Sequence, residues 1–88
     1  MENMNMDVKE AVTLAVQYYR SLDSLLPAND LRLEETTINQ RGNWLITVSS
    51  RDQSFPIVEK RNYKILEIDS QSKKVLSMRI RNPFAEAS

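Results

Sequence analysis

Hydrophobic and polar residues follow two different periods along this chain, a helical one at the start and a two-residue one afterwards. From Val8 to Leu26 apolar residues recur every three or four positions and fill an arc of roughly 200° at about 100° per residue. From Leu31 onwards, short segments alternate between apolar and polar residues, as β-strands do. The pattern predicts an α+β domain, with one N-terminal helix packed on a four-stranded antiparallel meander.

The predicted helix has recognisable start and stop signals. Asp7 and Glu10 have the D-x-x-E spacing of a capping box, which places the start near Asp7, with Asn5 as the alternative cap. Pro27 predicts an end at Leu26, because proline disfavours helical geometry in the residue before it.

The apolar arc of the helix is wider than packing on one sheet requires. Its centre, which we expect to face the sheet, consists of Val8, Ala15, Tyr19, Leu22 and Leu26. Leu14, Tyr18 and Leu25 then form a flank that needs another cover. A long loop or a second protein chain could supply that cover.

Four segments are predicted to be strands: Leu31–Ile38, Trp44–Ser49, Arg61–Ile68 and Lys74–Arg81. Ile38 is out of phase with the leucines before it, which a β-bulge near Glu34 and Glu35 would resolve. Gly42, the only glycine, is expected to take a positive φ angle in the turn that follows. In the second strand Trp44, Ile46 and Val48 share one face.

The third and fourth strands form the hairpin around which the sheet is organised. In the third, Tyr63 and Ile65 share one phase. Leu66 and Ile68 share the other, so the strand is either buried on both faces or contains a bulge. In the turn, Asp69 is expected to bond its own backbone. The fourth strand is predicted to point Leu76, Met78 and Ile80 inward and Arg79 and Arg81 outward.

The connection at residues 51–60 is long for a hairpin and carries three apolar residues around Pro56. One interpretation is a lid that covers the helix flank or the open end of the core. The other is a binding loop that presents Phe55 and Ile57 to a partner. The candidate protein-contact residues are Leu14, Tyr18, Leu25, Phe55, Ile57 and Val58.

The composition excludes several classes of chemistry. The chain has 88 residues, of which 41% are hydrophobic and 27% charged, and we interpret residues 1–88 as one domain with frayed ends at 1–5 and 83–88. Cysteine and histidine are absent, which excludes disulfides, cysteine-ligated zinc, and Ser–His–Asp and Cys–His catalysis. A single glycine cannot form a glycine-rich phosphate loop. We therefore predict no catalytic residue, no metal and no cofactor, and hence no enzyme.

The N-terminus lacks the basic and apolar regions of a secretory signal. The longest uncharged run of the helix, Ala11 to Tyr19, is too short to span a bilayer. We expect a cytoplasmic protein without membrane contact, unless a longer precursor has been trimmed.

Charge is unevenly placed although the net charge is zero. Residues 1–40 hold three basic and seven acidic side chains, and residues 41–88 hold nine basic and five acidic ones. Complementarity between helix and sheet is one explanation, and a basic binding face is the other.

The candidate basic patch consists of Lys64, Lys73, Lys74, Arg79 and Arg81. A patch of this kind could bind nucleic acid. Outward charge on an edge strand also prevents sheet-to-sheet aggregation, and we favour that interpretation.

Three features resemble a PepSY-like or cystatin-like small domain. They are the A-x-x-x-A pattern of the helix with its following tyrosines, the strand WLITVS, and the hairpin YKILEIDSQSKKVLSMRIR. In PepSY hairpins an aliphatic residue plus Asp precedes a polar turn and a Val-Leu pair follows it; Ile68-Asp69 and Val75-Leu76 stand at those positions. The turn glycine and the cystatin Q-x-V-x-G pattern are absent. PepSY relatives are typically exported or membrane-attached, whereas this chain shows no signal.

The resemblance implies a non-catalytic domain that binds or inhibits another protein. Together with the composition, it predicts a protein-binding module of adaptor, inhibitor or immunity type, whose partner is another protein or a second copy in a homodimer. The contact surface would be the loop at 51–60 and the helix flank. The alternative is a nucleic-acid-binding module that uses the basic face of the C-terminal hairpin.

Overall fold

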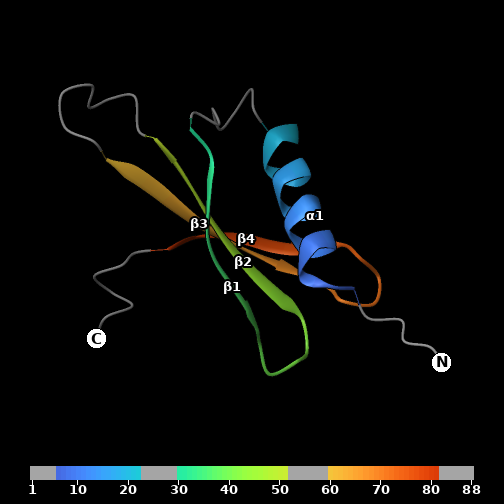
Figure 1. Cartoon of the computed structure of the whole chain (residues 1–88). Helices are drawn as coiled ribbons and strands as arrows, with labels where there is room; N and C mark the ends of the chain where they lie inside the picture. Colours follow the sequence, from blue (N-terminus) through green and yellow to red (C-terminus); the bar gives the residue numbers. More distant parts are fainter. Residues whose placement is uncertain (1–5, 23–29, 52–59, 82–88) are drawn as a thin grey trace.

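A computed structural model describes residues 6–22, 30–51 and 60–81, and it confirms the α+β class (Figure 1). The elements are α1 (Val8–Ser21), β1 (Arg32–Ile38), β2 (Trp44–Arg51), β3 (Arg61–Ile68) and β4 (Val75–Arg81). The strands lie in the order β1-β2-β3-β4, and every neighbouring pair is antiparallel. The sheet is therefore a meander with β1 and β4 at its edges.

Helix α1 begins where the capping-box spacing predicts. Asp7 is the N-cap, and its Oδ1 accepts a hydrogen bond from the Glu10 backbone N–H at 2.8 Å. The predicted end at Leu26 was wrong, because α1 ends at Ser21 with Leu22 as its C-cap. There the Leu22 N–H bonds to the Tyr19 carbonyl at 3.1 Å, which tightens the last turn and ends the α-helical ladder before the apolar periodicity stops.

Helix α1 packs on one face of the sheet, over β2, β3 and β4. Ala11, Ala15 and Tyr19 face the sheet and are buried. Val8 was expected there too but is 41% exposed. Met6, just before the helix, is buried in the core instead, and its carbonyl accepts a hydrogen bond from the Trp44 indole N–H at 3.1 Å.

The core lies between α1 and the two central strands. Its buried members are Met6, Ala11, Ala15, Tyr19, Ile46, Val48, Leu66 and Ile68. Trp44 packs against this cluster, so the predicted inner face of the second strand is confirmed. At the other end of β2, the Tyr19 hydroxyl lies 3.1 Å from Ser50 Oγ. Helix α1 therefore runs in the same direction as β2.

A register shift explains the broken alternation of β1 but not that of β3. The pairing of β1 with β2 shifts between Leu33 and Glu35, which confirms the predicted bulge. Strand β3 pairs with β2 without a shift, but its pairing with β4 shifts between Glu67 and Ile68. The extra residue at that shift is Leu76 of β4, so β3 itself contains no bulge. Residues 65–68 are all buried, which confirms burial on both faces as the explanation for this strand.

The second shift changes which residue of β4 enters the core. Val75 pairs with Ile68 and packs against the core cluster, whereas Leu76 is 50% exposed. The prediction that Leu76 points inward was wrong, because the bulge adds one residue at this point. Ile80 lies on the helix side of the sheet, paired with Lys64, but it is 76% exposed.

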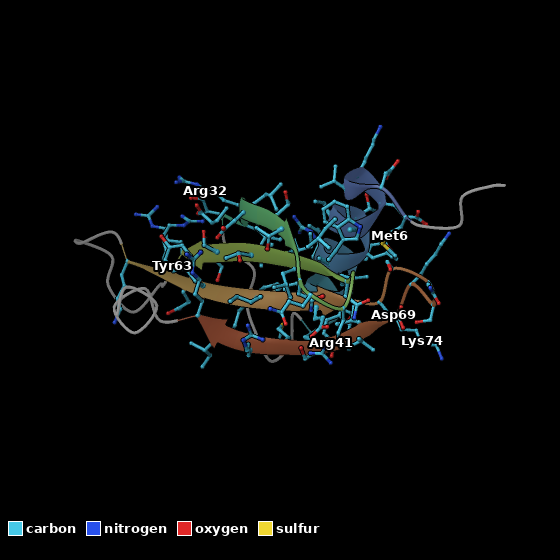
Figure 2. The ribbon with its side chains drawn as sticks, turned by 90° about the horizontal axis from the view of Figure 1, so that it is seen from below. Met6, Arg32, Arg41, Tyr63, Asp69 and Lys74 are labelled. Carbon is cyan, nitrogen blue, oxygen red and sulfur yellow. The ribbon has the colours of Figure 1, made fainter. Side chains whose placement is uncertain are left out.

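The opposite face of the sheet is not covered by any helix or strand within the described ranges. Figure 2 shows the strands side by side, with Met6, Asp69 and Lys74 toward one end of the sheet and Arg32 and Tyr63 toward the other. Thr47, Ser49, Ile65 and Glu67 lie on this face and are nevertheless buried. Polar and charged side chains from neighbouring strands and turns contact Ser49 and Glu67, and Thr47 and Ile65 lie at a hollow lined by Glu35, Arg79 and Arg81, as described below.

Candidate protein-binding surface

Strand β4 presents a different chemistry on each face of the sheet. Met78 pairs with Leu66, and Ile80 pairs with Lys64, which places both on the helix side. Arg79 and Arg81 alternate with them and point to the helix-free side. Within the described residues β4 pairs only with β3, so its outer edge faces away from the sheet.

One row of α1 lies toward the turn between β3 and β4. Glu10, Leu14 and Tyr18 form one row of the helix, because they are spaced four residues apart. The Glu10 carboxylate lies 2.8 Å from Lys73 Nζ, in the turn between β3 and β4. This row therefore runs along the β4 side of the helix. We call the surface formed by Leu14, Tyr18, Met78 and Ile80 the α1–β4 border.

The residues of the border differ in exposure, from partly buried in the core to exposed at the surface. Leu14 and Met78 are partly buried and pack against the core cluster. Tyr18 is 38% exposed and Ile80 is 76% exposed. Two of the six predicted protein-contact residues, Leu14 and Tyr18, thus lie on one surface. The others, Leu25, Phe55, Ile57 and Val58, lie outside the described residues, so the choice between lid and binding loop stays open.

The turn between β3 and β4 fixes the position of Lys73. Asp69 Oδ1 accepts a hydrogen bond from the Gln71 backbone N–H at 2.9 Å, which confirms the predicted Asp turn and holds the pKa of Asp69 below its usual range. Lys73 has a φ angle of 63° and donates its N–H to the Asp69 carbonyl at 2.9 Å. The turn thereby directs Lys73 toward α1.

The residues of the predicted basic patch do not form one patch. Lys64 shares the helix side with Ile80, because directly paired residues point to the same face. Lys73 is paired with Glu10, and Lys74 is exposed in the turn. Only Arg79 and Arg81 share the helix-free face. The prediction that Lys64 extends their patch was wrong because its register position gives it the opposite face.

A hollow of about 210 Å³ lies on the helix-free face, beside Arg79 and Arg81. Its lining residues are Glu35, Thr37, Leu45, Thr47, Ile65, Arg79 and Arg81. Thr47 and Ile65 are buried beneath it. Arg81 Nη1 reaches Glu35 Oε1 at 3.2 Å. Sequence reasoning missed this hollow, because only the register brings Glu35 and the two arginines of β4 to the same face.

Glu67 forms hydrogen bonds with two residues of the turn between β1 and β2. Its Oε2 accepts hydrogen bonds from Asn39 Nδ2 at 2.9 Å and from Asn43 Nδ2 at 3.0 Å. These two bonds, first of all the one from Asn43, hold the pKa of Glu67 below its usual range despite its burial. In the same turn Gly42 has a φ angle of 80°, as predicted.

Arg61 forms a second polar cluster on the helix-free face. Its Nε donates to Ser49 Oγ at 2.8 Å and its Nη1 to Asp30 Oδ2 at 2.9 Å. The guanidinium lowers the pKa of Asp30. Ser49 Oγ in turn donates to Glu34 Oε2 at 2.6 Å. This network attaches the start of β1 to β3 and occupies groups that a ligand would otherwise use.

Ion pairs join the acidic first part of the chain to the basic second part. Asp30 pairs with Arg61, and Glu10 pairs with Lys73. Glu35 pairs with Arg81. These contacts favour intramolecular complementarity as the explanation of the uneven charge.

No family model matches the chain, and neither a curated protein nor a solved structure matches it significantly. The resemblance to PepSY-like and cystatin-like domains therefore stays a hypothesis. Within the described residues, no cluster of three or more acidic side chains could hold a metal ion. No helix in this part of the chain is both long and apolar enough to cross a membrane.

Proposed function

We propose that this chain is a non-enzymatic protein-binding module that receives its partner at the α1–β4 border. The observation that carries the proposal is the exposure of Ile80 and Tyr18, at 76% and 38%, beside the packed Leu14 and Met78. A single exposed apolar residue is ordinary on a protein surface. Apolar side chains that continue from the core to an open sheet edge are instead typical of a contact surface.

The border has the composition of a binding hot spot. Tyr18 offers a large ring with few rotatable bonds, and Ile80 offers a branched apolar side chain. Complete burial of a side chain such as Ile80 stabilises a complex by about 1.5–3 kcal/mol. Leu14 and Met78 would stay fixed in the core while their outer atoms meet the partner. The surface therefore needs little ordering when it binds.

The proposed class is an adaptor, inhibitor or immunity protein. Binding requires no acid–base group or metal, which agrees with a sequence that lacks histidine and cysteine. Self-association through the same border is a variant of this proposal. The division of the basic residues between two faces supports nucleic-acid binding less well.

Site-specific photocrosslinking tests the proposed surface. A photoreactive amino acid replaces Ile80 or Tyr18 in the full chain, which is then expressed in its native host. The matched control position is Arg20, which is exposed on α1 two residues after Tyr18 and therefore points to the other side of the helix.

We expect the same partner to be crosslinked from positions 80 and 18 and not from position 20. The purified partner should then bind the unmodified chain, and Ile80→Ser should weaken that complex. Equal crosslinking from all three positions, or none from positions 80 and 18, would contradict the proposal. A crosslinked second copy of the chain would identify the self-associating variant.

A further inference from the structure

We infer that the outer edge of β4 takes up an extended segment of a partner protein, in which acidic and apolar side chains alternate. The inference rests on the proposed function and deepens it by stating the chemistry of the partner. It follows from three features of β4: an outer edge that no strand of the described residues pairs with, an apolar side and a basic side.

Both edge strands contain one bulge, but its position differs. From Ser77 to Arg81, each residue of β4 pairs with β3 without a register shift. Strand β1 has its bulge between Leu33 and Glu35, which leaves the shorter regular run Glu35–Ile38, whereas the bulge of β4 lies at its start, at Leu76. A bulge twists an edge away from further pairing, whereas a regular edge offers an even row of N–H and C=O groups. Strand addition is therefore better supported at β4 than at β1.

The helix side of β4 selects apolar residues. An added strand lies about 4.8 Å from β4, and every second side chain of that strand points to the helix side. Those side chains would lie beside Met78 and Ile80. Ile80, 76% exposed in the chain alone, would gain its cover there.

The helix-free side of β4 selects acidic residues. The intervening side chains of an added strand would lie beside Arg79 and Arg81. Arg81 is paired with Glu35, whereas Arg79 forms no direct salt bridge within the described residues and acts on Glu67 only at longer range. Opposite charges on directly neighbouring strands attract, and carboxylates fit the guanidinium fork. An acidic side chain at this position would give Arg79 a direct ion-pair partner.

The same charges argue against a second copy as the occupant. Two β4 strands paired edge to edge would bring the arginines of both copies to one face, and like charges on paired strands repel. The edge of β1 is acidic, but its bulge breaks the alternation that the proposed segment requires. We therefore assign the site to a different, acidic protein.

Peptide binding to the full chain tests the inference. The probe is a fluorescent peptide with the sequence Val-Glu-Ile-Glu-Val-Glu-Ile, and the readout is fluorescence anisotropy. One control peptide replaces every Glu by Lys, and another groups the same residues into a Glu block and an apolar block. We expect both controls to bind about tenfold more weakly or worse. Equal binding of the blocked peptide would overturn strand addition.

Backbone methylation separates strand addition from side-chain attraction. Alternate N–H groups of an extended peptide point to the same edge. Methylation of one alternate set should abolish binding, and methylation of the other set should leave it unchanged. Unchanged binding after both modifications would overturn the inference.

Variants of the chain locate the site. Arg79→Glu should weaken the acidic probe about tenfold and reverse the preference toward the Lys peptide. The matched control, Arg20→Glu, makes the same charge change on the far side of α1 and should leave affinity unchanged. Ile80→Ser should weaken binding without a change in charge. Equal losses in Arg79→Glu and Arg20→Glu would indicate general charge attraction and overturn the inference.

The two proposals can fail separately. One possible result is that a partner is crosslinked from positions 80 and 18, while the affinity for the probe changes neither in Arg79→Glu nor with the blocked peptide. This result would agree with the proposed function and overturn the strand-addition site. Sedimentation of the chain at several concentrations adds a further check. Self-association that Ile80→Ser abolishes and Arg79→Glu strengthens would show that a second copy, and not an acidic partner, occupies the edge.

Discussion

Glu35 on β1 and Arg81 on β4 form an ion pair of 3.2 Å that reaches from one edge of the sheet to the other. The two central strands lie beneath it, where Thr47 and Ile65 are buried although no helix or strand of the described ranges covers them. Long charged side chains thus shield the helix-free face in place of a second layer. The same pair holds Arg81 over the sheet, whereas Arg79 forms no salt bridge within the described residues.

Glu35→Gln should have a small effect on folding and a larger one on binding. Both side chains of the pair are partly exposed, at 49% for Glu35 and 28% for Arg81, so its loss should change the free energy of unfolding by less than about 1 kcal/mol. Arg81 would then lose its internal carboxylate and should bind the acidic probe more tightly. Urea denaturation and anisotropy measure the two effects. A weaker probe affinity in this variant would contradict the assigned role of Arg81.

Glu67→Gln should destabilise the domain at neutral pH and reduce its sensitivity to acid. The folded protein holds the pKa of Glu67 below its ordinary value of 4.5, first through Asn43 and then through Asn39. A lowered pKa contributes stability above the unfolded value, and that contribution is lost as the pH falls from 4.5 through the folded value. Gln accepts fewer hydrogen bonds, so the loss at neutral pH should be about 1–3 kcal/mol.

Denaturation of both proteins at a series of pH values below neutrality measures this difference. Asp30 and Asp69 also have lowered pKa values, so the variant should keep part of the acid sensitivity. The difference between the two unfolding free energies should shrink as the pH falls. A difference that stays constant with pH would show that Glu67 does not act through its charge.

Gly42→Ala tests the turn that Glu67 clamps. The φ angle of Gly42 is 80°, a region that costs other residues about 1–2 kcal/mol, and no atom within 4 Å would clash with an added Cβ. We expect the free energy of unfolding to fall by roughly 1 kcal/mol through backbone strain alone. Thermal denaturation checks this, and a loss several times larger would point to a steric clash instead.

The sequence predicted those elements that depend on neighbouring residues. The cap at Asp7, the positive φ of Gly42 and the Asp69 turn are local, and each is present. The bulge in β1 left a visible break in alternation. The helix end at Ser21 left no visible break in the sequence pattern, because the apolar residues continue beyond it. The end depends instead on the backbone hydrogen bond of Leu22.

The candidate surface was only partly predictable, because it depends on register. Leu14 and Tyr18 could be recognised as an uncovered flank from their helical spacing. Their closeness to β4 depends on the contact between Glu10 and Lys73, which no local pattern specifies. The bulge opposite Glu67 also exchanged the expected places of Leu76 and Val75. Single-residue shifts of this kind move side chains between faces, and only the pairing reveals them.

Tyr18 and Tyr19 should separate binding from folding in one pair of variants. Tyr19 is buried and its hydroxyl bonds Ser50, so Tyr19→Ala should cost about 3–5 kcal/mol of unfolding free energy. Tyr18 lies at the α1–β4 border and is 38% exposed, so Tyr18→Ala should cost less than about 1 kcal/mol. The crosslinked partner and the acidic probe should nevertheless bind Tyr18→Ala more weakly, because the ring would cover the apolar side of the added strand. If Tyr18→Ala folds normally and binds the partner and the probe with unchanged affinity, the helix flank is not part of the proposed surface, and only β4 remains in it.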